Sequence, residues 1–251
     1  LRQSVCRWPF SHIPDQEFYP AVKALGFEAV DLLTEREWPL AEAAGLTCSM
    51  ATPTERSDFI ARGLNDRANH PLLLGELERT IRGAEARGYE RVIAMIGNRD
   101  GRSDADGLAA CTEALRQIVP LAEEQGITIC LELLNSRVDH HDFMGDRMTF
   151  GLQLMYTVNS PRVRLLYDIY HMQIMDGDII RTIRDQSHWI SHYHTAGNPG
   201  RHELDGSQEL QYAAIAQAIA ESGHTGWIAH EFLPTKDWMA GLAEARVVCG
   251  G

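Results

Sequence analysis

Short apolar runs alternate with longer amphipathic segments from one end of the chain to the other. The apolar runs show little alternation with polar residues, a pattern typical of strands that are buried on both faces. The predicted strands span residues 2–7, 28–32, 46–50, 91–96, 127–133, 163–168, 189–195 and 226–232. The predicted helices span residues 15–25, 35–44, 70–88, 105–125, 149–158, 174–185, 208–222 and 236–248.

This alternation predicts a (β/α)8 barrel. The chain has 251 residues, close to the roughly 250 that are typical of that fold. An open doubly wound sheet would show the same alternation, but a dinucleotide-binding sheet needs a glycine-rich turn after its first strand. Residues 5–10 contain no glycine, and no linker, repeat or charge block divides the chain. We therefore predict a single α/β domain over residues 1–251, folded as one (β/α)8 TIM barrel.

The composition indicates an ordinary folded protein with an acidic surface. Hydrophobic residues make up 44% of the chain and charged residues 23%, which argues against disordered and collagen-like classes. The formal net charge is −12, so the average surface field repels a phosphate backbone and disfavours a nucleic-acid partner. No apolar run approaches the roughly 18 residues of a membrane span. We expect a cytoplasmic protein with no membrane partner.

The five cysteines are scattered and never form the close pairs of zinc sites or redox motifs. They are Cys6, Cys48, Cys111, Cys130 and Cys249. We expect reduced, mostly buried thiols that pack like small apolar side chains, and no cysteine-based chemistry.

Polar residues stand at the ends of four late predicted strands, where the active sites of TIM barrels lie. They are Glu132, Asp168, His194 and Glu231. Carboxylates that meet at one place raise one another's pKa and destabilise the fold, and a divalent cation removes that conflict. An oxygen-rich set with one nitrogen suits Mn²⁺ or Mg²⁺, with Co²⁺ as an option, better than a thiolate-type zinc site would.

Three of these residues also have a structural interpretation. Asp168 could cap the following helix. His192 and His194 would point to the same side of a strand, so that one of them could be a core histidine. Only one of His230 and Glu231 can face the pocket, because neighbouring strand residues point to opposite sides.

Four segments carry a family resemblance that spans the chain and is sharpest after residue 127. The sequences ELLNSR (132–137), YDIYHMQ (167–173), PGRHE (199–203) and AHEF (229–232), with His194, resemble the hydroxypyruvate isomerase branch of the xylose isomerase-like TIM-barrel superfamily. The resemblance implies that Glu132, Asp168, His194 and Glu231 bind one divalent metal ion. It also suggests a homo-oligomer.

The resemblance further implies that two residues bind substrate oxygens. They are His171, three residues beyond Asp168, and Arg201 in the Pro-Gly-Arg segment. A guanidinium fork suits a carboxylate bidentately. Without the resemblance, Arg201 would equally be a solvated loop charge, and His171 a helix-start histidine with no role.

Further candidate substrate contacts are Trp8, Asn135 and Glu203. Trp8 follows the first predicted strand and would supply an apolar wall, with a buried core tryptophan as the alternative. The segment DHHD at residues 139–142 is either a lid that contacts substrate or a solvated polar turn, and we favour the turn.

The resemblance implies a metal-dependent isomerase that interconverts hydroxypyruvate and tartronate semialdehyde, or acts on a closely related small keto acid or keto sugar. Such a reaction removes a proton next to a carbonyl, and a chelating metal stabilises the cis-enediolate that results. Glu132 and Glu231 come from different parts of the barrel rim. We therefore predict that they are paired acid and base, with the direction of transfer left open.

Other functions compete with this one. Hydroxypyruvate isomerases often have Gln at the position of His194 and Pro at that of Leu133, whereas ketose 3-epimerases use His as the ligand, so a ketose 3-epimerase or other sugar isomerase stays open. An endonuclease IV-like nuclease needs histidines on early strands, but residues 48–51 and 94–97 offer none, and Gly200 stands where a late aspartate is needed. A binding barrel without catalysis is disfavoured because all four candidate ligands are present.

Overall fold

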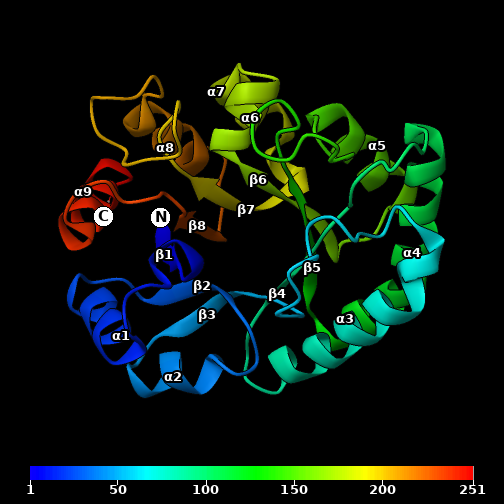
Figure 1. The fold of residues 1–251 in the computed structure, drawn as a ribbon, viewed down its shortest axis with the longest axis horizontal. Coiled ribbons are helices and arrows are strands. Elements are labelled where there is room, and N and C mark those ends of the chain that lie inside the picture. Colours follow the sequence, from blue (N-terminus) through cyan, green and yellow to red (C-terminus); the bar gives the residue numbers. More distant parts are fainter. Residues whose placement is uncertain (251) are drawn as a thin grey trace.

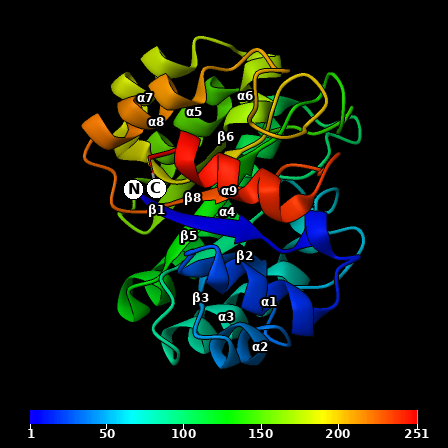
Figure 2. The same ribbon diagram turned by 90° about the vertical axis from the view of Figure 1, so that its left-hand side faces the viewer.

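The computed structural model describes residues 1–250, and in them eight parallel strands close into one barrel in sequence order, which confirms the predicted TIM barrel (Figure 1). The strands are β1 (Arg2–Cys6), β2 (Ala29–Leu33), β3 (Thr47–Ala51), β4 (Arg91–Ala94), β5 (Thr128–Leu133), β6 (Val163–Asp168), β7 (Ile190–Thr195) and β8 (Trp227–His230). Parallel pairing of β1 with β8 closes the barrel. The two ends of the chain therefore lie side by side, as Figure 2 shows.

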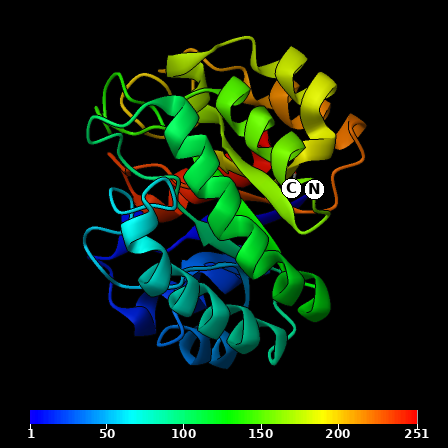
Figure 3. The same ribbon diagram turned by 90° about the vertical axis from the view of Figure 1, so that its right-hand side faces the viewer.

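Helices surround the barrel and cover the outward faces of its strands. They are α1 (Asp15–Ala24), α2 (Trp38–Ala43), α3 (His70–Glu85), α4 (Asp104–Gln125), α5 (Met148–Val158), α6 (Ile169–Met175), α7 (Ile179–Gln186), α8 (Tyr212–Glu221) and α9 (Trp238–Val248). Short 3-10 turns form at Trp8–Phe10, Arg67–Asn69 and Ser187–Trp189. Figure 3 shows α3 and the long α4 packed side by side on the outside. Helix α4 begins with Ser103, whose hydroxyl accepts a hydrogen bond from Asp106 N, and ends at Gly126 in the left-handed conformation.

One predicted helix is wrong in its extent. The sequence predicts a helix over 174–185, whereas the chain forms two helices there, α6 and α7. Gly177 and Asp178 separate them with positive φ angles of 65° and 47°, which no continuous α-helix accommodates. Helix α6 begins directly after β6 and therefore lies over the C-terminal end of the barrel, which we call the mouth.

The loop between β3 and α3 folds back against the end of β4. Leu64 N donates to Met95 O at 3.0 Å, and Asn65 N donates to Ile96 O at 2.9 Å. A Cβ atom at Gly63 would overlap the Ile96 carbonyl, so this close backbone approach requires glycine.

The structure also describes the cysteines and the lengths of the helices. All five cysteines are free and buried, and burial raises the pKa of Cys130 to about 12, so it stays a thiol at neutral pH. Among the described residues, none of the helices combines the length and the apolar character that a membrane crossing requires.

We predict opposite effects for two glycine-to-alanine substitutions. Gly63→Ala should cost about 2 kcal/mol or more, because the new methyl group displaces the β4 backbone. Gly75→Ala should gain about 0.5–1 kcal/mol, because Gly75 lies within α3 and a Cβ there meets nothing within 4 Å. Urea unfolding of both variants checks this. Equal stabilities would contradict the close approach at Gly63.

Candidate active site

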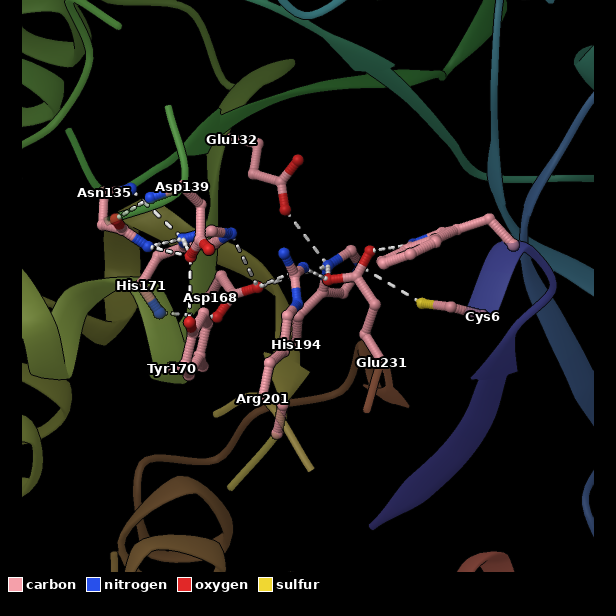
Figure 4. A network of polar contacts seen from close by, with 12 residues as sticks. Cys6, Glu132, Asn135, Asp139, Asp168, Tyr170, His171, His194, Arg201 and Glu231 are labelled. Atoms are coloured by element: carbon pink, nitrogen blue, oxygen red, sulfur yellow. Dashed lines mark hydrogen bonds and ion pairs between the residues drawn. The ribbon is translucent and has the colours of Figure 1, made fainter. Parts of the chain in front are cut away.

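The predicted metal ligands meet at the mouth of the barrel. Glu132 comes from β5, Asp168 from β6, His194 from β7, and Glu231 directly follows β8. One ligand atom from each lies within 4.8 Å of the other three, and none of these residues is more than 3% exposed. In Figure 4 the carboxylates of Glu132, Asp168 and Glu231 point toward the region of His194. The structure thus brings together a set of ligands that could hold a divalent cation.

Burial and neighbouring charges shift the pKa values of the residues in this cluster. Burial raises the pKa of Glu132, and raises that of Asp168 to about 8. Glu132 Oε1 is buried and accepts no hydrogen bond. Burial opposes a charge on His194, but the neighbouring Glu231 carboxylate raises its pKa well above the usual range. Burial of a carboxylate oxygen without a hydrogen bond costs free energy, and a bound cation would offset that cost.

Glu231 is the most heavily engaged of the carboxylates. Trp8 Nε1 donates to Glu231 Oε1 at 2.5 Å, and Arg201 Nη2 donates to Oε2 at 2.5 Å. His194 Nδ1 lies 3.0 Å from the same Oε2. Burial alone would raise the pKa of Glu231, but His194 and Arg201 hold it well below the usual range. Glu231 is therefore a carboxylate at neutral pH.

Asp168 has two roles, one for each carboxylate oxygen. Its Oδ1 accepts a hydrogen bond from His171 N at 2.9 Å and so caps helix α6. Its Oδ2 lies 3.5 Å from Arg201 Nη2 and 4.0 Å from His194 Nδ1. The capping role and a place in the ligand cluster are therefore compatible.

The alternation of side chains along a strand determines which of the neighbouring histidines and acids point into the barrel. His192 and His194 both point into the barrel, where each has a ring nitrogen near Asp31. His230 points away from the mouth, with Nδ1 2.8 Å from Thr195 Oγ1 and Nε2 2.9 Å from Gln3 Oε1. Burial lowers the pKa of His230 to about 3. It is a satisfied core histidine, and Glu231 is the residue that faces the cluster.

A cavity of about 370 Å³ opens beside the cluster. The second half of the barrel lines it mainly with polar side chains, namely those of Glu132, His140, His171, Arg201 and Glu231, together with Leu134. The first half lines it almost entirely with apolar ones, namely those of Trp8, Leu32, Phe59, Ile60, Ile93 and Met95, together with Thr52. A small polar molecule held against the cluster would thus have an apolar wall behind it, which excludes water.

Arg201 lies between two aromatic rings at the edge of this cavity. Its guanidinium carbon is 5.2 Å from the Trp8 ring centroid and 5.3 Å from that of Tyr170. Arg201 itself has a φ of 60° and follows Gly200 at 97°, a turn that aims its side chain back over the barrel. Its Nε is buried without a hydrogen-bond partner, so the guanidinium has a donor to spare for a ligand.

His171 presents one definite tautomer to the cavity. Asn135 N donates to His171 Nδ1 at 3.2 Å, so Nδ1 is an acceptor and Nε2 carries the proton. Burial lowers the pKa of His171 well below its usual range, which keeps the ring neutral. Its Nε2 is buried and has no hydrogen-bond partner. The ring can therefore donate one hydrogen bond to an oxygen in the cavity.

The remaining predicted contacts divide into two groups. Trp8 lines the cavity and is 42% exposed, so a buried core tryptophan is wrong. Asn135 lies behind His171 and does not line the cavity. Glu203 accepts hydrogen bonds from Thr235 N and Oγ1 and so orders the loop after β8, away from the cavity. In the 139–142 segment, which we interpreted as a solvated turn, His140 lines the cavity.

Sequence analysis missed Asp31. It lies within β2, is completely buried, and has its Oδ2 2.9 Å from His194 Nε2. The available signal was an acidic residue inside an apolar run, Ala29-Val30-Asp31-Leu32-Leu33, of a strand predicted to be buried on both faces. A carboxylate in such a place needs a partner.

Curated relatives match this chain over much of its length. A 2-oxo-tetronate isomerase of Cupriavidus necator is 30% identical over 242 residues, covering 92% of each chain. A hydroxypyruvate isomerase of Escherichia coli is 30% identical over 166 residues, covering 64% of this chain and 62% of that protein. Both names are those of isomerases, in agreement with the isomerase that the sequence predicts.

The fold is found among solved structures as well. The crystal structure of a family 2 AP endonuclease from Brucella melitensis superimposes with a TM-score of 0.88 at 24% identity, covering 97% of this chain and 98% of that one. At that identity the likeness concerns the fold alone. The family model for the xylose isomerase-like TIM barrel matches residues 20–246. With eight strands closed in sequence order around the acidic cluster, the chain belongs to the xylose isomerase-like TIM barrel family.

Proposed function

We propose that this protein is a metal-dependent isomerase of a small 2-keto acid with a hydroxyl group on the next carbon, either hydroxypyruvate or its four-carbon analogue 2-oxo-tetronate. The observation that carries the proposal is the buried cluster of Glu132, Asp168, His194 and Glu231 beside a 370 Å³ cavity. The named activities of the two curated relatives support the choice of keto acids.

The residues of the cluster fit one divalent cation. Glu132, Asp168, Glu231 and His194 would hold it, because three carboxylates and one imidazole form an oxygen-rich donor set with an unsatisfied oxygen on Glu132. Such a set suits Mn²⁺, Mg²⁺ or Co²⁺. When bound, the cation would supply Lewis acidity toward the carbonyl and hydroxyl oxygens of the substrate.

The residues around the cavity would orient the keto acid. Arg201 would bind the substrate carboxylate, since its guanidinium lies between the Trp8 and Tyr170 rings and keeps a free donor. His171 would donate its Nε2 hydrogen to a second substrate oxygen. The apolar side chains of the first half of the barrel would keep water from the reacting carbons.

Glu132 and Glu231 would exchange the proton with the substrate. In hydroxypyruvate, one carboxylate removes a proton from the carbon that bears the hydroxyl group, which leaves an enediolate. Return of a proton to the former carbonyl carbon, with transfer of the hydroxyl proton to the other oxygen, gives tartronate semialdehyde. Glu132 is the less engaged of the two, because Glu231 already accepts hydrogen bonds from Trp8 and Arg201.

A ketose 3-epimerase is the second candidate. The cavity has room for a chain longer than three carbons, and the nitrogen ligand would be His194, at the position where ketose 3-epimerases of the same superfamily use His. Epimerisation uses the same proton removal next to a carbonyl but returns the proton to the same carbon from the other side. The substrate therefore distinguishes the two functions.

We expect a divalent metal ion to stabilise the protein. At one hundred times its dissociation constant, Mn²⁺ should add about 2.7 kcal/mol, equivalent to a rise in Tm of roughly 5–10 °C for a chain of this size. Asp168→Asn should lose most of this shift but remain folded, because an asparagine at the start of α6 still caps the helix. Differential scanning fluorimetry with and without EDTA measures both. An unchanged Tm in the wild type would refute the metal site.

Removal of either acid or base should stop turnover. Glu132→Gln and Glu231→Gln should each lower kcat by about 10²–10⁴-fold, with circular dichroism spectra like that of the wild type. Glu244→Gln is the matched control, because Glu244 is exposed on α9. Wild-type rates in either site variant would exclude the paired mechanism.

Solvent exchange identifies the substrate. The Mg²⁺-loaded protein is incubated in D₂O with hydroxypyruvate, 2-oxo-tetronate and a panel of ketoses, and deuterium next to the carbonyl is followed by NMR. We expect exchange and isomerised product with one of the two keto acids. Exchange with a ketose alone would establish the epimerase, and no exchange with any of them would refute both functions.

A further inference from the structure

Asp31 is a charged residue at the centre of the barrel for which the proposed reaction has no use. It is 0% exposed and lies on the opposite side of the His194 ring from the carboxylate cluster. Its Oδ2 is 2.9 Å from His194 Nε2, whereas His194 Nδ1 is 3.2 Å from Glu132 Oε1 and 3.0 Å from Glu231 Oε2. The imidazole is thus held between Asp31 and the cluster by its two nitrogens.

This arrangement defines which nitrogen can bind a metal. A carboxylate can only accept at Oδ2, so the Nε2 of His194 must carry a hydrogen and donate it to Asp31. In the neutral ring that a metal ion requires, the lone pair is then on Nδ1, the nitrogen that faces Glu132 and Glu231. A histidine ligand usually donates its other nitrogen to a carboxylate or a carbonyl, which fixes the tautomer and the plane of the ring.

Asp31 is itself held in place by several groups. Ser49 Oγ donates to Asp31 Oδ1, and His192 Nε2 lies 3.1 Å from the same oxygen. Cys6 Sγ is 3.6 Å from Asp31 Oδ2 and 3.9 Å from His194 Nε2. These groups come from β1, β3 and β7, so three strands besides β2 hold the carboxylate. Despite burial, the two histidines hold the pKa of Asp31 well below its usual range.

The backbone next to Asp31 is strained. The register between β2 and β3 shifts on both sides of Asp31, and the following residue, Leu32, has a φ of 57°. This conformation is unfavourable for a residue other than glycine and persists where the surrounding structure holds it in place. The irregularity lies directly beside the carboxylate that contacts His194.

We propose that Asp31 is a positioning residue, which holds His194 with Nδ1 toward the carboxylate cluster and thereby raises the affinity of the cluster for its metal ion. This inference rests on the metal site of the proposed function, but it does not depend on which substrate the protein converts. Asp31 does not line the cavity, and in this proposal it acts on the metal ion only through His194.

Isothermal titration of the folded protein with Mn²⁺ tests the proposal. Asp31→Leu keeps the approximate shape and removes the acceptor, and its dissociation constant should rise about 10–100-fold. Asp31→Asn keeps an oxygen that can accept a hydrogen bond from His194 Nε2, so its Mn²⁺ affinity should lie between those of the wild type and Asp31→Leu. Ser49→Ala is the matched control, because it removes a hydrogen bond to Asp31 but no contact of His194, and it should stay within about threefold of the wild type.

A second measurement reads the orientation directly, even where Asp31→Leu fails to fold. In the Mg²⁺-loaded wild type, ¹H–¹⁵N correlation spectra of the imidazoles should show His194 protonated on Nε2 alone. A proton on Nδ1, or an unchanged Mn²⁺ affinity in folded Asp31→Leu or Asp31→Asn, would overturn the positioning role.

The outcome can be separated from that of the proposed function. If the Asp31 variants lose metal affinity and the wild type converts none of the substrates, Asp31 remains a positioning residue and the isomerase is rejected. If the wild type converts a substrate and the Asp31 variants keep their metal affinity, the isomerase remains and the positioning role is rejected. A wild type that binds no Mn²⁺ would overturn both.

Discussion

The burial of like charges at one end of the barrel is the constraint on which the site depends. Glu132, Asp168 and Glu231 are withdrawn from water within 4.8 Å of one another, and without opposite charge this would cost several kcal/mol for each ion. His194 and Arg201 supply the opposite charge that the chain itself provides. The loop after β7 places Arg201 beside the cluster through a left-handed turn, and this conformation is unfavourable for a residue other than glycine.

Barrel geometry explains how residues from distant parts of the sequence form this cluster. Parallel strands end at the same edge, so one residue at the end of each of four successive strands reaches the mouth. The same geometry divides the cavity, because the first four strands and their loops provide most of the apolar lining and the last four provide the charged groups. A substrate between the two halves would contact charged groups on one side and, on the other, an apolar surface that excludes water.

The sequence predicted the barrel and the four cluster residues because both follow from strand periodicity and from the position of polar residues at strand ends. It predicted less where tertiary contacts decide. The early start of α6 depends on Asp168, which caps a helix that begins at Ile169. The break between α6 and α7 depends on the positive φ angles of Gly177 and Asp178, and the amphipathic pattern over 174–185 indicates neither feature. The acidic residue inside the apolar run 29–33 indicates that Asp31 needs a partner, but His194 is 163 residues away, and no local pattern identifies it as that partner.

Asp168 shows how tightly the site and the fold are coupled. Its Oδ1 fixes the start of helix α6, which carries His171 into the cavity and Tyr170 beneath Arg201. Its Oδ2 faces the cluster. A change in the position of this carboxylate would therefore move a ligand oxygen, a hydrogen-bond donor and the support of the guanidinium together. Such coupling through rigid side chains is a reason for a short helix directly after β6, where a flexible loop would leave the three groups independent.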